Sequence, residues 1–231
     1  MKKLILIAAL AFAVSTAFAD DTINDIQDGT IAPGTAVSVE GVVIYSAPGE
    51  FSGAFCFVNE PGAGAYSGVK VYWSSAREAE FAGLARGDLV DITGVTLEYF
   101  DETEIDVSDT LDTVVKVGTS AISGPDNVDL PWTEPWEGCF VVTNCTQVTV
   151  LQNQYYEWEV TDHTGSGLCD DATAAYLSYV PAIGDARVIQ GALGYSFGAY
   201  KLQPREDADI TACQWTSTDA MSWGGVKALF Q

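Results

Sequence analysis

The sequence predicts an all-β protein made of two consecutive five-stranded barrels, with a short helix in the first. Two observations lead to this prediction. The segment GDLVDITG at 87–94 returns as GDARVIQG at 184–191, an offset of 97 residues (184 − 87). Both halves also contain short runs of alternating apolar residues between turns rich in Gly and Pro, a pattern typical of strands. Self-similarity at a fixed offset indicates two copies of one structural unit.

The first copy supplies five strands and one helix. The strands are expected at 37–43, 55–58, 69–73, 89–95 and 104–107. The segment 75–84, with its Ala, Glu and Arg residues, favours a helix between the third and fourth strands. Three strands, a helix and two further strands is the element order of the OB-fold, a five-stranded barrel.

The second copy repeats the strand pattern with a reduced helix. Its strands are expected at 138–150, 157–161, 168–170, 186–193 and 199–203, and residues 172–179 can form one or two helical turns. The prediction is an OB-fold-like domain at 28–122, a turn-rich linker at 123–135, a second OB-fold-like domain at 136–213 and a tail at 214–231. A two-sheet sandwich is the alternative arrangement.

The N-terminus has the order of a cleavable secretion signal. Lys2 and Lys3 precede the apolar stretch 4–14, and the small-residue pattern Ala-Phe-Ala ends at Ala19. The apolar stretch is short for a membrane-spanning helix, so we expect residues 1–19 to be removed and no transmembrane segment in the mature chain. The protein is therefore predicted to be exported: periplasmic, secreted or at the cell surface.

The charge balance argues against tight nucleic-acid binding. The chain has 10 Lys and Arg against 32 Asp and Glu, a formal net charge of −22 that becomes −24 once Lys2 and Lys3 are lost with the signal. The remaining basic residues are scattered and form no continuous stripe that would track a phosphate backbone. An acidic, well-solvated surface is the simpler interpretation.

The motif at 87–94, together with GVKVY at 68–72 and FCFVN at 55–59, resembles the OB-fold-like module of secreted bacterial nucleases. The second copy, at 155–162 and 195–205, is more similar to exported bacterial proteins of no known activity that carry such modules. The resemblance implies an OB-fold and a nucleic-acid-binding accessory role. It does not extend to the nuclease catalytic domain, so it implies no catalytic residue.

The loop between the last two strands of the second copy is the candidate binding site, because OB-folds bind ligands there and across the second and third strands. It combines aromatic rings with positive charge, as stacking sites do. The predicted ligand-binding residues are Trp158, Tyr195, Phe197, Tyr200, Lys201 and Arg205. The alternative is that these aromatics pack to close the barrel. In the first copy, Tyr99 or Phe100 is expected to plug the barrel end.

The sequence motifs do not indicate a catalytic site, a metal site or a cofactor site. His163 is the single histidine, and no nucleophile elbow or HExxH helix is present. The acidic clusters at 101–104, 106–112 and 170–171 do not match a calcium loop. We therefore predict no enzyme activity, no metal and no cofactor.

The expected function is that of a secreted binding or interaction protein. The alternatives are a nucleic-acid-binding accessory protein and a binder of carbohydrate or of a cell-surface polymer. The sequence does not identify the extracellular ligand or the oligomeric state.

The five cysteines predict at least one disulfide in the second domain, because exported cysteines oxidise. Two disulfides among Cys139, Cys145, Cys169 and Cys213 is the simplest arrangement, with Cys213 free to pair with any of the other three. Cys56 is expected to be a buried thiol.

At the C-terminus, Trp223, Val226 and Phe230 share one helical face. This ending resembles Trp-Gly-x-x-Lys-Ala tails of exported bacterial proteins, which implies sorting or surface anchoring.

Overall fold

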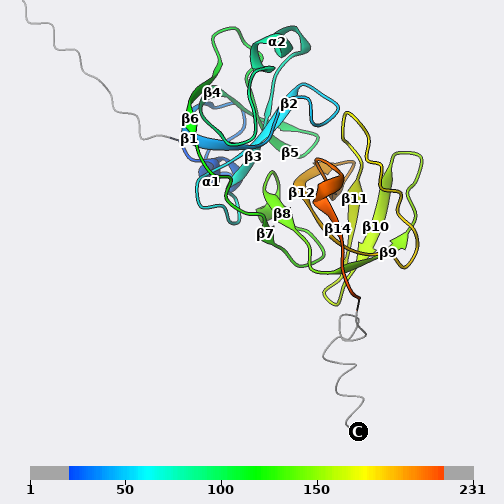
Figure 1. Cartoon of the computed structure of the whole chain (residues 1–231). Helices are drawn as coiled ribbons and strands as arrows, with labels where there is room; N and C mark the ends of the chain where they lie inside the picture. Colours follow the sequence, from blue (N-terminus) through cyan, green and yellow to red (C-terminus); the bar gives the residue numbers. More distant parts are fainter. Residues whose placement is uncertain (1–20, 216–231) are drawn as a thin grey trace, which may run out of the picture.

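The computed structural model describes residues 21–215, and strand pairing within them closes two barrels (Figure 1). In the first barrel, β1 (Ala36–Ser46) pairs with β2 (Phe55–Asn59), β2 with β3 (Gly68–Tyr72), β3 in parallel with β5 (Glu102–Asp106), β5 with β4 (Asp88–Tyr99), and β4 with β1. This ring order is that of the OB-fold. The predicted all-β class is confirmed.

The second barrel closes by the same pairings. Strand β9 (Thr146–Val150) pairs with β10 (Glu157–Thr161), β10 with β11 (Ser166–Asp170), β11 in parallel with β13 (Ala199–Gln203), β13 with β12 (Ala186–Ser196), and β12 with both β9 and β8 (Phe140–Val142). The single strand expected at 138–150 is therefore divided into β8 and β9. Residues 143–145 interrupt it, because Thr143 and Cys145 are used in contacts with neighbouring segments.

The helices are short, and one of them was not predicted. The segment expected to be helical at 75–84 forms a 3₁₀ turn, Ser75–Arg77, followed by α2 (Glu78–Phe81). Helix α1 (Ile23–Gln27) precedes the first barrel; the Thr22 hydroxyl accepts a hydrogen bond from the Asp25 amide, and Ile23 and Ile26 enter the core of that barrel. An N-cap of this kind is a standard helix start.

The helical turns expected at 172–179 do not form. The backbone of this segment pairs instead with the β1–β2 loop of the first barrel: the Ser52 amide donates to the Ala172 carbonyl and the Ala174 amide to the Glu50 carbonyl, both at 2.9 Å. Phe51 and Thr173 form an antiparallel bridge between the two barrels. Tertiary pairing therefore overrides the weak local helical preference.

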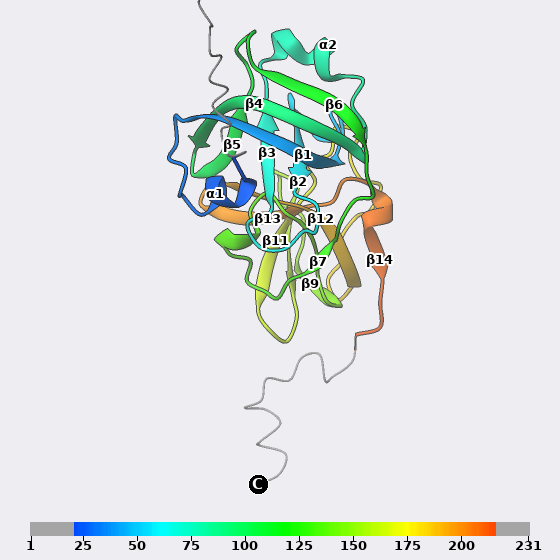
Figure 2. The ribbon, with the colours of Figure 1, turned by 90° about the vertical axis from the view of Figure 1, so that its left-hand side faces the viewer.

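Further strands extend both barrels. Strand β6 (Thr113–Thr119) adds to β4, β7 (Asp126–Asn127) lies parallel to β8, and β14 (Ile210–Ala212), after a 3₁₀ turn at Asp207–Asp209, adds to β12 (Figure 2). A further 3₁₀ turn spans Glu134–Trp136. The segment expected to be a linker also buries Val128, Leu130 and Trp132 in the second core. Residues 123–135 thus pack on the second barrel.

Two glycines of the motif at offset 97 have the same structural role in each barrel. A Cβ at Gly94 would lie 2.7 Å from the Asp106 carbonyl oxygen, and a Cβ at Gly191 would lie 2.1 Å from the Gln203 carbonyl oxygen. Both contacts are far shorter than van der Waals distance, so only glycine lets the fourth and fifth strands of each barrel approach this closely.

A buried aromatic cluster joins the barrels. Tyr45, Phe51 and Phe57 of the first barrel pack against Phe140 and Ala192 of the second. The Tyr45 hydroxyl donates to the Gly138 carbonyl at 2.6 Å. Because each barrel also has its own apolar core, this cluster is an interface between two folded units, and it fixes one barrel against the other.

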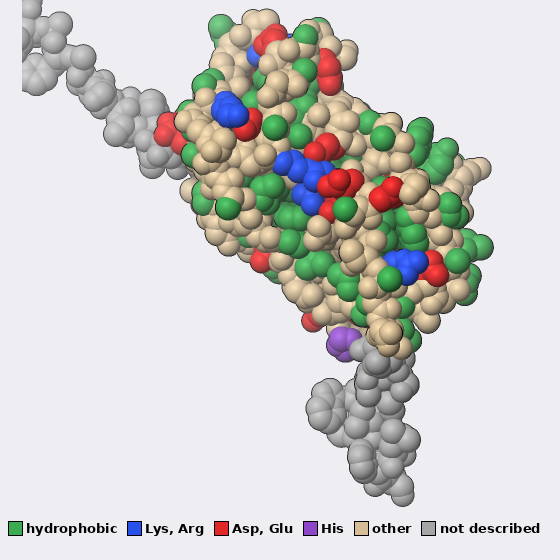
Figure 3. Space-filling model, in the orientation of Figure 1, with side chains coloured by type: hydrophobic (Ala, Val, Ile, Leu, Met, Phe, Trp, Pro, Cys, Tyr) green, Lys and Arg blue, Asp and Glu red, His purple; other side chains and the backbone are tan. Residues whose placement is uncertain are grey.

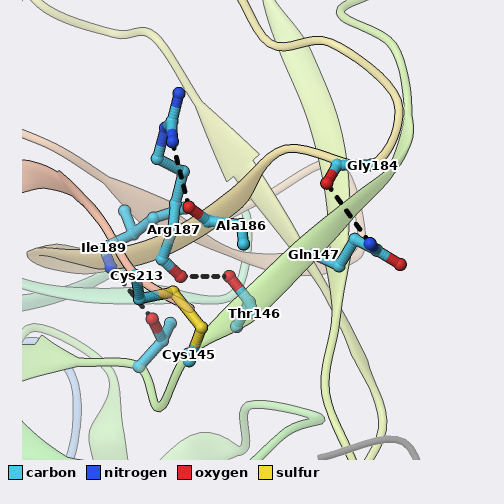
Figure 4. The surroundings of a disulfide bond; sticks show 9 residues. Cys145, Thr146, Gln147, Gly184, Ala186, Arg187, Ile189 and Cys213 are labelled. Atoms are coloured by element: carbon cyan, nitrogen blue, oxygen red, sulfur yellow. Dashed lines mark hydrogen bonds between the residues drawn. A yellow bond between two sulfur atoms is a disulfide. The ribbon is translucent and has the colours of Figure 1, made fainter. Parts of the chain in front are cut away.

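One disulfide is present, between Cys145 and Cys213 (Figure 4). It ties the start of β9 to the end of β14, so the predicted bridge in the second domain is confirmed. The arrangement with two bridges is wrong, because Cys139 and Cys169 are buried thiols at separate places in the second domain. Cys56 is a buried thiol, as expected, and burial raises the pKa of its thiol well above the ordinary value.

The predicted signal at 1–19 and the apolar face of Trp223, Val226 and Phe230 lie outside the described residues. Within residues 21–215, none of the helices has the length and apolar character needed to cross a membrane.

Candidate functional site

The hairpins between the fourth and fifth strands end in equivalent turns. Phe100 and Asp101 have φ of 53° and 66°, and Phe197 and Gly198 have φ of 52° and 82°. Two successive positive φ values make the two-residue turn that matches the twist of a hairpin. Phe100 and Phe197 are separated by the offset of 97 residues, and a bulky side chain at positive φ is uncommon. Both turns nevertheless present a phenylalanine to solvent, 77% and 98% exposed.

The two turns line one hollow of about 520 Å³. Tyr99 and Phe100 form one wall, Tyr195 and Phe197 the other, and Lys70 lies among the lining residues. The Tyr195 amide donates to Glu102 Oε1 at 3.2 Å, a direct bond between the two barrels beside the hollow. The site is therefore composite, because each barrel supplies one aromatic wall.

A second hollow of about 310 Å³ continues from the first across β2, β3 and β5 of the first barrel. It shares Lys70 and Tyr99 with the first hollow and adds Phe55, Tyr72 and Glu104. We call the combined surface the aromatic groove, defined by its six rings: Phe55, Tyr72, Tyr99, Phe100, Tyr195 and Phe197. The groove covers the second and third strands and the loop between the last two, which is where OB-folds bind ligands.

The groove is acidic. The Lys70 ammonium lies 2.7 Å from Glu102 Oε2 and 3.3 Å from Glu104 Oε2, and 4.8 Å from the centre of the Phe55 ring. Burial disfavours the charged ammonium, but the two carboxylates outweigh this effect and hold the pKa of Lys70 above its ordinary value. Burial raises the pKa of Glu104, and Lys70 opposes the shift. Asp101 also lines the groove, so its lining carries three carboxylates and one ammonium, a formal net charge of −2 when all are ionised.

Of the six residues predicted to bind a ligand, Tyr195 and Phe197 line the aromatic groove. Trp158, 1% exposed, belongs to the core of the second barrel. The Tyr200 ring packs at a tilt against Tyr195, with ring centres 4.8 Å apart, and its hydroxyl donates to Glu134. It lines a different, smaller hollow with Trp132 and Pro131.

The two predicted cations are buried and already paired. Lys201 is 3% exposed and its ammonium contacts Glu157. Arg205 is 8% exposed; it donates to both oxygens of Asp209 at 2.8 Å and to the Tyr45 carbonyl at 2.8 Å. The positive charge expected near the binding loop is therefore neutralised within the protein. On the face in Figure 3, basic side chains likewise lie beside acidic ones and form no continuous stripe.

The prediction that Tyr99 or Phe100 plugs the barrel end is wrong, because both rings face solvent, 55% and 77% exposed. Phe55 and Lys70 were missed as groove residues. Lys70 could have been predicted from strand alternation. Val69 and Val71 are fully buried, so the side chain of Lys70 between them points to the opposite face of the strand. The pairing of the two turns across the barrels had no signal in the sequence.

His163 and Asp162 do not line the aromatic groove. His163 is exposed on a turn, and the Asp162 carboxylate beside it accepts hydrogen bonds from the amide and hydroxyl of Thr164. Among residues 21–215, three or more His, Cys, Asp or Glu side chains do not come together in a way that could hold a metal ion.

No family model and no curated protein matches the chain. Among solved structures, it is similar to the wild-type single-stranded DNA binding protein from Thermus aquaticus, with 11% identity over 84% of this chain and 98% of that chain and a TM-score of 0.23. A deletion mutant of the same protein gives 12% identity, 80% and 98% coverage and a TM-score of 0.24. The strand order of the structure itself defines the class: an all-β protein with OB-fold topology.

Proposed function

We propose that the protein is an exported, non-catalytic binding protein that holds a chain of sugar rings in the aromatic groove. The observation that carries the proposal is the set of six rings that line two adjoining hollows, together with carboxylates in the same lining. Export is supported by the signal-like sequence at 1–19.

The chemistry of the groove suits a sugar polymer. An aromatic face packs against the apolar C–H face of a sugar ring, and carboxylate oxygens accept hydrogen bonds from its hydroxyl groups. Phe100 and Phe197 are exposed in two-residue hairpin turns, and an aromatic side chain has only two rotatable bonds to order when a ligand binds. A groove made by two barrels also favours an extended ligand over a single small molecule.

Single-stranded nucleic acid is the second candidate. Exposed rings on the ligand-binding face of an OB-fold are the feature that favours it, because bases stack on such rings. The charge opposes it: Lys70 already contacts two carboxylates, and phosphates would lie beside a net charge of −2. We therefore rank the sugar polymer first.

The test is calorimetric titration with neutral oligosaccharides, among them a hexamer of N-acetylglucosamine and a hexamer of glucose, and with a thymidine oligonucleotide. We expect a hexamer to bind and Phe197→Ala to weaken it about tenfold, the upper range for one aromatic contact. Tyr155→Ala is the matched control, because Tyr155 is 67% exposed and lies outside the groove. Tighter binding of the oligonucleotide than of either hexamer, or binding of neither hexamer, overturns the proposal.

A further inference from the structure

We infer that the aromatic groove selects sugar polymers that carry protonated amino groups. This inference rests on the proposed function and adds the charge of the ligand to it. The groove is lined by three carboxylates, of Asp101, Glu102 and Glu104, and by one ammonium, that of Lys70. The buried Lys201 ammonium also lies 5.4 Å from the centre of the Phe197 ring, but Glu157 pairs with it. Two of the three lining carboxylates already contact Lys70, so the third, Asp101, supplies the excess charge nearest to solvent.

A ligand amine that contacts the Asp101 carboxylate would also lie beside the aromatic rings of the groove. Asp101 is exposed, it follows Phe100 directly in the turn, and it lines the same hollow as Tyr99 and Phe197. A cation against an aromatic face and beside a carboxylate gains from both interactions, and aromatic cages for organic cations use this combination. A neutral sugar gains only from the rings.

The protein already places an ammonium against a ring of this groove. Lys70 Nζ lies 4.8 Å from the centre of the Phe55 ring and also contacts the carboxylates of Glu102 and Glu104. The arrangement of one amine, one ring and carboxylates is therefore sterically and electrostatically stable here. A ligand amine near Phe100 and Asp101 would repeat it at the open end of the groove.

The surroundings strengthen the preference. Two further exposed carboxylates lie close to the groove: Glu98 directly precedes Tyr99, and Glu134 accepts a hydrogen bond from Tyr200, whose ring packs against Tyr195. The field in this region is negative, which attracts an amine and repels phosphate or carboxylate groups. An acidic sugar polymer is disfavoured for the same reason.

The experiment compares a glucosamine hexamer with its fully N-acetylated counterpart, by calorimetry, below and above the pKa of the sugar amine. We expect the amino form to bind about tenfold more tightly when protonated and to lose this advantage when neutral. Asp101→Asn should remove the advantage and leave the acetylated hexamer unchanged. Asparagine tolerates the positive φ of this turn, so the variant keeps the fold.

Glu40→Gln is the matched control, because Glu40 is exposed and lies outside the groove, and its removal changes the net charge equally. Equal affinity for the two hexamers overturns this inference and leaves the proposed function standing. Binding of neither hexamer overturns the inference, and it overturns the proposed function as well when the glucose hexamer also fails to bind. An amine preference that Glu40→Gln reduces as much as Asp101→Asn also overturns the inference, because the net charge and not the groove would then select the ligand.

Discussion

Glu137 should make the stability of the protein depend on pH. Its side chain is 1% exposed at the junction of the barrels, where Oε1 accepts a hydrogen bond from the Thr103 amide at 2.7 Å. Burial, and to a lesser extent the like charges of Glu102, Glu134 and Glu98, raises the pKa of Glu137 from 4.5 to about 8, while the Thr103 amide opposes the shift. The carboxyl group is therefore protonated in the folded protein at neutral pH.

The sign of the pH dependence follows from this direction. Below pH 4.5 Glu137 is protonated in both the folded and the unfolded chain, and its full contribution to stability is present. Between pH 4.5 and about 8 the unfolded chain ionises and the folded one does not, so the free energy of unfolding falls by about 1.4 kcal/mol per pH unit. Above the folded pKa the loss levels off at about 5 kcal/mol, an order-of-magnitude value.

Urea unfolding of the wild type and Glu137→Gln, followed by tryptophan fluorescence from pH 5 to pH 9, measures this effect. Glutamine resembles the protonated carboxyl group and still accepts from Thr103. We expect the two proteins to have similar stability at pH 5, and the variant to be more stable by several kcal/mol at pH 9. Glu40→Gln should track the wild type at every pH. A constant difference between wild type and Glu137→Gln across the pH range would refute the reasoning.

Three further predictions concern the junction and the cysteines. Gly68→Ala should lower the free energy of unfolding by about 2 kcal/mol, because its Cβ would lie 2.1 Å from the Gly138 carbonyl oxygen. Gly83→Ala is the control and should change the stability little, because the space around Gly83 is open. Equal effects of the two substitutions in urea unfolding would contradict this prediction. Tyr45→Phe should lose about 1–3 kcal/mol by leaving the Gly138 carbonyl without its donor, and an unchanged urea midpoint would argue against that bond. Thiol counting on denatured, unreduced protein should find three thiols, since Cys145 and Cys213 are bridged; a count of one or five would be inconsistent with the structure.

The strands and their order were predictable because they depend on local pattern. Alternating apolar residues define β3 and β4, and the predicted helix coincides with the short turn and α2. The glycines at offset 97 were also visible, and the structure explains them by strand contacts that exclude a Cβ. Such features depend on a few neighbouring residues, so the sequence displays them directly.

The candidate site was only partly predictable. Exposed aromatics in hairpin ends pointed to Phe197 and Tyr195, but the same reasoning selected Trp158, Lys201 and Arg205, which are buried. Residue type does not reveal whether a cation has a partner. Glu157 and Asp209 neutralise Lys201 and Arg205 through contacts that span 44 and four residues of sequence.

By itself the sequence determined the β class, the strand order of each barrel and the presence of a bridge in the second domain. Those properties follow from periodicity, from turn residues and from the oxidation expected of cysteines behind a signal-like N-terminus. The tertiary structure alone decided how the barrels face each other: the aromatic cluster around Tyr45 and the bond from Tyr195 to Glu102 bring Phe100 and Phe197 into one groove. The physical reason is that these contacts join residues about 90 positions apart, and their geometry depends on the packing of both barrels at once.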